Sequence, residues 1–143
     1  MKIKEWSGIL AASLILALSC QQALLAAPED EKAALEAAGT WLSLVDSGEY
    51  DRSWDQAASL FKSALSKSQW TGSLQGVRKP LGKTISRGVA SAKYTTSLPG
   101  APDGQYVIIQ YNTSFENKKS AVETVTPMRD KDGKWRVSGY FIK

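Results

Sequence analysis

Apolar side chains recur at helical spacing through the first half of the chain that follows residue 27. Pro28 to Glu31 place acidic residues in a first helical turn, where they suit the helix dipole, and Gly48 marks a stop. A second helix is predicted to open at Asp51, and a third at Ser66, which forms a capping box with Gln69. The three apolar stripes are Leu35, Ala38, Leu42 and Val45; Trp54, Ala58, Phe61 and Leu65; and Trp70, Leu74, Val77 and Leu81. The pattern predicts three short amphipathic helices.

From about Lys83 the hydrophobic period changes to two, and turn signals divide the rest of the chain into four strands. The signals lie at Pro99–Gly104, Asn117–Lys118 and Asp132–Gly133, and the Asp-Gly step is the strongest of them. Consecutive strands joined by such short turns pair antiparallel. The second half is therefore predicted to be a four-stranded antiparallel meander.

The turns also predict which residues face one another. Two-residue hairpins at Asn117–Lys118 and Asp132–Gly133 pair Tyr111 with Thr124 and Thr124 with Phe141. A further pairing of Leu98 with Val107 places Tyr94 beside Tyr111. Pro127 has no N–H to donate, so it is expected at a bulge or an edge-like break. The predicted inner face consists of Ala90, Ala92, Tyr94, Thr96, Val107, Ile109, Tyr111, Thr113, Phe115, Val122, Thr124, Thr126, Met128, Trp135, Val137 and Phe141.

Three helices followed by a meander define an α+β fold with the helices packed on one face of the sheet. The chain after the first 27 residues is long enough for one domain of this kind, predicted over residues 28–143. No internal repeat or linker divides it.

Residues 1–27 have the pattern of an export signal. Lys2 and Lys4 precede an uncharged run from Ile9 to Leu18. The run leads into Ala17-Leu18-Ser19-Cys20, which is compatible with a lipoprotein signal that is cleaved before a lipidated Cys20. Ordinary cleavage after Ser19 or near Ala26 is a second alternative, and an uncleaved membrane anchor is a third. Each alternative exports the domain, which is expected in the periplasm, soluble or tethered to a membrane through Cys20.

Composition excludes several kinds of chemistry. The chain has no histidine and one cysteine, Cys20, so histidine acid–base catalysis, a Cys or Ser–His nucleophile and a His/Cys metal cluster are excluded. Its net charge of +4 is spread without a basic block, which disfavours nucleic-acid binding. We expect no catalytic residue, no metal and no cofactor.

Three segments resemble an exported bacterial family known as domain of unknown function 4019. They are Tyr94–Gly104, Thr113–Lys118 and Asp130–Tyr140, and the stretch Trp41–Gly48 with Ser53-Trp54 is similar too. The resemblance covers nearly the whole predicted domain and implies no activity. The order of helices and strands also resembles the NTF2-like or cystatin-like cone, in which a curved sheet wraps a helix and can hold a small ligand.

Two surfaces are candidates for function. The predicted inner face carries hydroxyls that either pack as core residues or line a polar concavity for a small ligand, and Trp54 lies on the helices that would cover it. The candidate ligand-binding residues are Tyr94, Tyr111, Thr113, Thr124, Thr126 and Trp54. The predicted outer face would bind a second copy or an envelope protein through Ile108, Val125, Tyr140 and Ile142.

Partner binding through the outer face ranks first, ligand binding second and an enzyme of the cone type third. An enzyme would need a carboxylate pointing into the cone. Glu123 is predicted to point outward, so the inner face is expected to hold no ionisable group, unless a helix acid such as Asp55 turns inward.

Overall fold

The computed structural model describes the backbone of residues 13–143, with side chains from residue 27 onward. Helix α1 spans Ser13–Asp46, α2 Tyr50–Asp55, α3 Ser59–Ala64 and α4 Lys67–Val77, and a 3-10 turn, η1, spans Lys79–Leu81. The strands are β1 Thr84–Thr95, β2 Tyr106–Phe115, β3 Lys118–Arg129 and β4 Trp135–Ile142. Lys2 and Lys4 and most of the predicted signal run lie outside the described residues, as does the side chain of Cys20.

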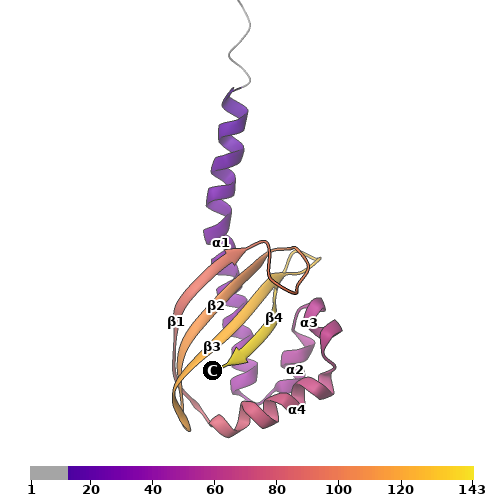
Figure 1. Cartoon of the computed structure of the whole chain (residues 1–143), viewed down its shortest axis with the longest axis vertical. Coiled ribbons are helices and arrows are strands. Elements are labelled where there is room, and N and C mark those ends of the chain that lie inside the picture. Colours follow the sequence, from indigo (N-terminus) through magenta and orange to yellow (C-terminus); the bar gives the residue numbers. More distant parts are fainter. Residues whose placement is uncertain (1–12) are drawn as a thin grey trace, which may run out of the picture.

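The strands form one antiparallel sheet in the order β1-β2-β3-β4, as the meander prediction requires. The sheet is curved, α1 runs along one of its faces, and α2, α3 and α4 lie beside β4 and the C-terminal end of α1 (Figure 1). The N-terminal part of α1 projects beyond the sheet. The architecture is α+β, with its core between α1, the shorter helices and the concave face of the sheet.

The predicted start of the first helix is wrong and its end is confirmed. Helix α1 runs continuously from Ser13 through Pro28, instead of beginning at that proline. It ends at Asp46, and Gly48 follows with a φ of 75°, the left-handed conformation that glycine adopts without steric cost. The N–H groups of Gly48 and Glu49 cap the carbonyls of Val45 and Leu44 at 3.1 and 2.9 Å.

The second predicted helix is divided, so residues 13–143 contain four α-helices instead of three. Ala58 adopts an extended conformation, and its N–H donates to the carbonyl of Val137 on β4 at 2.8 Å. This contact with the sheet takes the place of a helical hydrogen bond and separates α2 from α3. The capping box of α4 is confirmed: Ser66 Oγ accepts from the N–H of Gln69, whose side chain accepts from the N–H of Ser66.

The predicted register between β2 and β3 is wrong by one residue. Phe115 pairs with Lys118, so the hairpin loop is Glu116–Asn117. A bulge between Thr113 and Phe115 then shifts the register once more, and Tyr111 pairs with Glu123 instead of Thr124. Because alternate residues face opposite sides, this shift moves every side chain of β3 to the other face. Ala121, Glu123, Val125 and Pro127 point inward, whereas Val122, Thr124, Thr126 and Met128 lie on the outer face.

The other pairings explain the remaining differences. Thr124 pairs with Phe141 as predicted, so Phe141 shares the outer face and is 50% exposed. The bulge expected at Pro127 is confirmed by a register shift between Thr126 and Pro127. Tyr94 pairs with Val107, not beside Tyr111, because β1 ends at Thr95 and the connection to β2 is longer than the predicted turn Pro99–Gly104. Ala90 and Thr96, predicted to point inward, are exposed.

An aromatic cluster joins the helices to the sheet. Trp41 packs edge-on against Tyr140 at a centroid distance of 5.3 Å, and Phe61 against Trp70 at 4.9 Å. The indole N–H groups are satisfied within the same layer: Trp41 donates to the carbonyl of Ser53 at 2.8 Å, and Trp70 donates to the Ser53 hydroxyl at 2.9 Å. Each ring therefore buries its apolar surface without leaving a polar group unpaired.

Candidate functional site

The inner face of the sheet holds a carboxylate, which contradicts the prediction of an interior without ionisable groups. The side chain of Glu123 is 0% exposed. One carboxylate oxygen accepts from Arg87 Nε at 2.7 Å and from the Thr113 hydroxyl at 2.6 Å. The other accepts from Arg87 Nη2 at 3.2 Å and from the Tyr140 hydroxyl. Four donors thus saturate the buried acid.

Arg87 links this acid to a second one at the end of α1. Its Nη1 and Nη2 donate to the two carboxylate oxygens of Asp46 at 2.7 and 3.0 Å. Asp46 also accepts from the Thr84 hydroxyl at 3.0 Å and from Arg78 Nη2 at 3.2 Å. Glu123, Arg87, Asp46 and Arg78 therefore form a row of alternating charge, which we call the ionic row.

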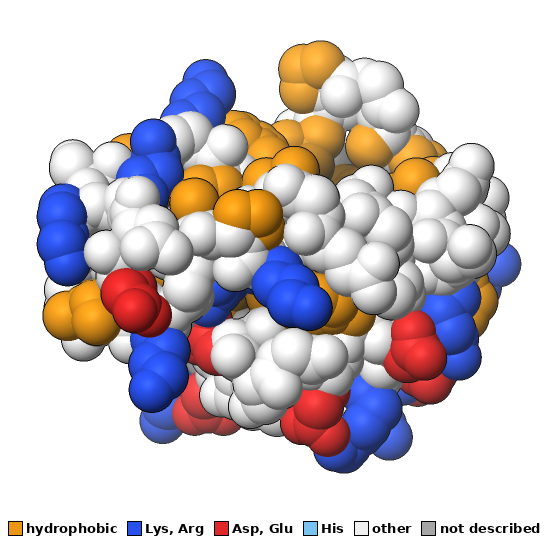
Figure 2. All heavy atoms as spheres, turned by 90° about the horizontal axis from the view of Figure 1, so that it is seen from below, with side chains coloured by type: hydrophobic (Ala, Val, Ile, Leu, Met, Phe, Trp, Pro, Cys, Tyr) orange, Lys and Arg blue, Asp and Glu red, His pale blue; other side chains and the backbone are white. Residues whose placement is uncertain are grey.

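Exposure increases along the ionic row from Glu123 to Asp46 and falls again at Arg78. The side chains of Glu123, Arg87 and Asp46 are 0%, 15% and 27% exposed, and that of Arg78 is 4% exposed. Asp46, Arg78 and Lys83 line a cavity of about 420 Å³ at the C-terminal end of α1. Figure 2 views the molecule from this end and shows acidic and basic side chains interspersed around a hollow. The mixture of signs means that this end has no strong preference for an anion or a cation.

The pKa shifts follow from burial and from the row's own charges. Burial alone would raise the pKa of Asp46. The hydrogen bonds that Arg87 donates and its positive charge outweigh this effect, with smaller contributions from hydrogen bonds of Thr84 and Arg78, so the pKa is lowered overall. Burial raises the pKa of the Tyr140 hydroxyl, and the negative charge of Glu123 raises it further. Tyr140 therefore stays protonated and donates its hydrogen to Glu123. Arg78 is 3% exposed and lies over the Phe115 ring, 4.6 Å from its centroid.

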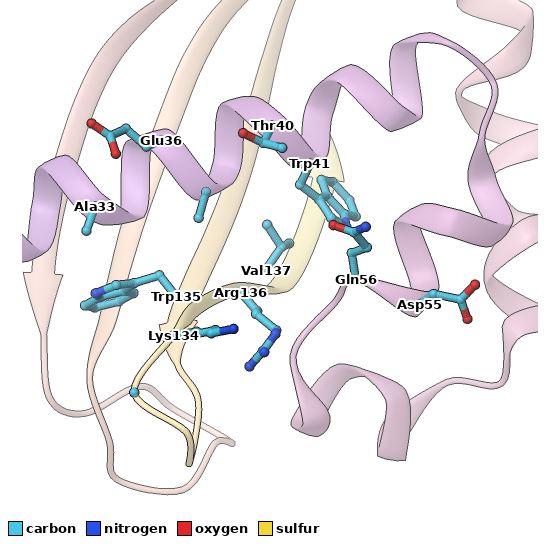
Figure 3. Close-up of a pocket in the computed structure, with 12 residues that line it drawn as sticks. Ala33, Glu36, Thr40, Trp41, Asp55, Gln56, Lys134, Trp135, Arg136 and Val137 are labelled. Carbon is cyan, nitrogen blue, oxygen red and sulfur yellow. The ribbon is translucent and has the colours of Figure 1, made fainter.

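A groove of about 660 Å³ lies between α1, the end of α2 and the β3–β4 hairpin (Figure 3). In the close-up, α1 crosses the hairpin with Ala33 facing the Trp135 indole. Its apolar lining comes from Ala33, Ala37, Trp41, Trp135 and Val137. Its polar lining comes from Glu36, Thr40, Asp55, Gln56, Lys134 and Arg136. An apolar surface edged by polar groups is the usual composition of a binding groove.

The outer face of the sheet has a different character. Between Ile108 and Ser114 on β2 and between Val122 and Met128 on β3, it presents eight uncharged side chains, which we call the outer strip: Ile108, Gln110, Asn112, Ser114, Val122, Thr124, Thr126 and Met128. The half-exposed ring of Phe141 lies next to Thr124. Two charged residues stand at the margins, Lys93 opposite Ile108 and Arg136 opposite Met128. The described helices pack on the inner face and beside β4, so no helix within residues 27–143 covers this strip, although Thr124 at its centre is only 5% exposed.

The structure separates the residues that the sequence grouped as ligand-binding. Tyr94, Tyr111 and Thr113 lie on the inner face, where the hydroxyl of Thr113 is used by Glu123. Thr124 and Thr126 lie on the outer strip. Trp54 belongs to the helical layer, where its indole N–H donates to the carbonyl of Leu65 at 2.8 Å.

The predicted outer-face residues are separated as well. Ile108 lies on the outer strip as expected. Placing Val125, Tyr140 and Ile142 there is wrong, because Val125 is 0% exposed in the core, Tyr140 bonds Glu123, and Ile142 pairs with Glu123 on the inner side. Sequence reasoning missed Glu123, Arg87 and Asp46. The sequence signal that could have indicated this site is the occurrence of Arg87 and Glu123 within two predicted strands, where opposite charges can pair.

These observations define a single α+β domain in which helices fill the concave face of a four-stranded antiparallel sheet. A family model described as "Protein of unknown function (DUF4019)" matches residues 37–140, and the chain belongs to this family. A search of curated proteins finds no match. Within the residues that the structure describes, no helix has both the length and the hydropathy needed to cross a bilayer. Within the same residues, no three acidic or thiol side chains converge as metal ligands would.

Proposed function

We propose that the chain is an exported, non-enzymatic domain that pairs with a second copy of itself through the outer strip. The observation that carries the proposal is the absence of charge from the eight side chains of the strip, in a chain of which 22% is charged. Charged residues are depleted at the centres of protein interfaces, where their desolvation would cost free energy. Hydroxyl, amide and aliphatic groups are compatible with an identical surface facing them.

The size of the face agrees with this proposal. Strand β2 is ten residues long and the sheet has four strands. At about 3.3 Å per residue and about 4.8 Å per strand, the whole four-stranded face covers roughly 600 Å², of which the outer strip on β2 and β3 is about half. A dimer centred on the strip would also cover β1 and β4, and the whole face is of the same order as the roughly 800 Å² that each partner buries in a stable dimer. In a two-fold dimer the same patch serves both subunits, so no second surface is required.

Two further features support a binding role over catalysis. The inner carboxylate, Glu123, has no exposed surface and accepts four hydrogen bonds, so it has no oxygen free for a substrate. The curved sheet around α1 also resembles the NTF2-like cone, whose outer sheet face often serves in dimerisation; this likeness of fold supports the choice of face and not an activity. A small-ligand role for the inner face loses support, since Thr124 and Thr126 lie on the other side.

The test is the mass of the purified chain in solution, by sedimentation velocity, for the wild type and two variants. We expect a dimer for the wild type and a monomer for Ile108→Glu/Phe141→Glu, because two pairs of carboxylates would be buried face to face. Val89→Glu is the matched control: Val89 is 53% exposed against 50% for Phe141, but lies on edge strand β1 opposite Tyr111. A monomeric wild type, or a double variant that remains dimeric, would contradict the proposal.

Export is tested separately, by the intact mass of the chain recovered from the membrane and periplasmic fractions. We expect either a chain acylated at Cys20 or a chain shortened by cleavage near Ser19 or Ala26. Recovery of the whole uncleaved chain from the cytoplasm alone would overturn this part of the proposal without affecting the dimer test.

A further inference from the structure

The groove of Figure 3 borders an unpaired edge of the sheet. Strand β4 is the last in the order, so only β3 pairs with it along its length. Among the described residues, its other edge makes a main-chain hydrogen bond with Ala58, whose N–H donates to the carbonyl of Val137 at 2.8 Å. This contact shows that the outer edge of β4 accepts an approaching chain.

The main-chain groups of Trp135 point to the same edge. In an antiparallel strand, the groups of residues two apart point to one side, and those of Val137 and Trp135 are therefore turned alike. The pairing with β3 agrees: Arg129, opposite Trp135, directs its own N–H toward Gln105 at 2.9 Å, away from β4. The N–H and carbonyl of Trp135 thus face the groove.

The side chains next to this edge are suited to an apolar occupant. Ala33 and Ala37 lie one turn apart on α1 and present only methyl groups, so a chain can approach the helix closely. The Trp135 indole, half-buried, and the buried Trp41 provide flat apolar surface. Lys134, exposed at the margin, has no ion-pair partner within 4.0 Å among the described residues, so it is available to a carboxylate.

We infer that the groove binds a short, extended apolar peptide segment that pairs with the main chain of Trp135. A peptide in this position adds a strand to β4, donating one N–H to the Trp135 carbonyl and accepting from its N–H. Its side chains alternate between the Ala33–Ala37 surface and solvent, and a C-terminal carboxylate lies within the field of Lys134. The site lies on the inner side and edge of the sheet, so it is independent of the proposed dimer through the outer strip.

The test is a titration of the ¹⁵N-labelled chain with the tripeptide trivaline, followed by the amide and indole resonances of Trp135. We expect saturable shifts at Trp135 and its neighbours, with a dissociation constant of about 1 mM or tighter. Trivaline methylated on its central amide nitrogen lacks the donor for the Trp135 carbonyl, and we expect it to bind at least about tenfold more weakly.

Two variants separate groove binding from a general effect. Ala37→Arg fills the groove, and we expect the shifts at Trp135 to disappear. Gly39→Arg adds the same side chain two residues away, at a position where a Cβ meets nothing within 4 Å, and it should bind trivaline like the wild type. The inference is overturned by the absence of saturable shifts, by unchanged binding in Ala37→Arg, or by equal affinity for the methylated peptide, which would indicate capture by apolar contact alone.

Discussion

Replacing Glu123 by glutamine tests whether the ionic row holds the fold together. Each carboxylate oxygen accepts two hydrogen bonds, from Arg87 Nε and Thr113 on one side and from Arg87 Nη2 and Tyr140 on the other. Glutamine retains one oxygen and turns an NH₂ group toward the other pair of donors. The hydroxyls can rotate, but the guanidinium has no acceptor to offer. One N–H of the Arg87 guanidinium therefore faces the NH₂ group of the introduced glutamine without an acceptor, although the hydrogen bonds of Arg87 to Asp46 persist.

The expected cost follows from these losses. Removing one partner of a buried ion pair costs roughly 3 to 5 kcal/mol, and the contacts of Arg87 with Asp46 place this case at the lower end, about 3 kcal/mol. A domain of this size is stable by about 5 to 15 kcal/mol. The melting temperature should therefore fall by roughly 10 °C. Guanidinium unfolding followed by tryptophan fluorescence should show the lower midpoint with an unchanged slope.

Two comparisons make this prediction decisive. Glu36→Gln changes an exposed glutamate on α1, and it should alter stability by less than about 0.5 kcal/mol. Glu123→Leu combined with Arg87→Met removes both charges, and its cost should fall short of the sum of the single costs by at least about 1 kcal/mol. If Glu123→Gln loses less than about 1 kcal/mol, the buried pair does not stabilise the domain and its structural role is refuted.

Three further predictions concern other parts of the fold. The pKa of Asp46 is lowered in the folded state, so the ionised carboxylate contributes its full stabilisation of the fold above about pH 4 and loses it as the pH falls through the folded-state pKa. The urea midpoint of the wild type should therefore drop in acid, and that of Asp46→Asn should drop less. Ser53→Ala removes the hydroxyl that accepts from the Trp70 indole N–H at 2.9 Å, and it should lower the free energy of unfolding, measured by chemical denaturation, by about 1 to 3 kcal/mol. An unchanged free energy would mean that another acceptor replaces the Ser53 hydroxyl. Gly82→Ala should lower the melting temperature, because Gly82 has a φ of 75° and a Cβ there would lie 2.8 Å from Glu116 Oε2. Gly88→Ala is the control, since a Cβ at Gly88 meets nothing within 4 Å, and it should lower the melting temperature much less. Equal effects of the two substitutions would contradict the strain assigned to position 82.

Local signals in the sequence predicted the elements whose causes are local. The capping box at Ser66 and Gln69 lies within one turn of helix, and the stop at Gly48 depends on the glycine itself. The number and order of the strands follow from turn residues between alternating runs. The bulge at Pro127 follows from a missing donor. Each of these features needs no information from a distant part of the chain.

The β2–β3 hairpin could not be predicted in this way, because distant residues select its loop. The N–H of Glu116 donates to the carbonyl of Lys83 at 2.8 Å, and that of Asn117 to the carbonyl of Leu81 at 2.9 Å. The side chain of Asn117 also donates to the carbonyl of Pro80 at 2.9 Å. These bonds from the η1–β1 connection hold Glu116 and Asn117 in the loop, one residue earlier than the turn signal indicates. That change moves the pairing by two residues, and the bulge between Thr113 and Phe115 moves it back by one, so the net shift is one residue. The break between α2 and α3 has the same origin, since Ala58 bonds to β4.

This single shift explains why the inner acid was missed. Judged from β3 alone, Val122, Thr124, Thr126 and Met128 form the better inner face, because the alternative set contains Glu123. A charged side chain without a partner would make that alternative very costly. Arg87 removes the difficulty from two strands away, since it pairs with Thr113 in the β1–β2 register and thereby faces Glu123. The observed register and the ionic row therefore depend on each other. A slip of β3 by one residue would place Thr124 on the inner face in place of Glu123 and leave Arg87 bonded to Asp46 alone. The buried pair therefore disfavours the register that the hydrophobic pattern prefers, in addition to any stabilisation it provides.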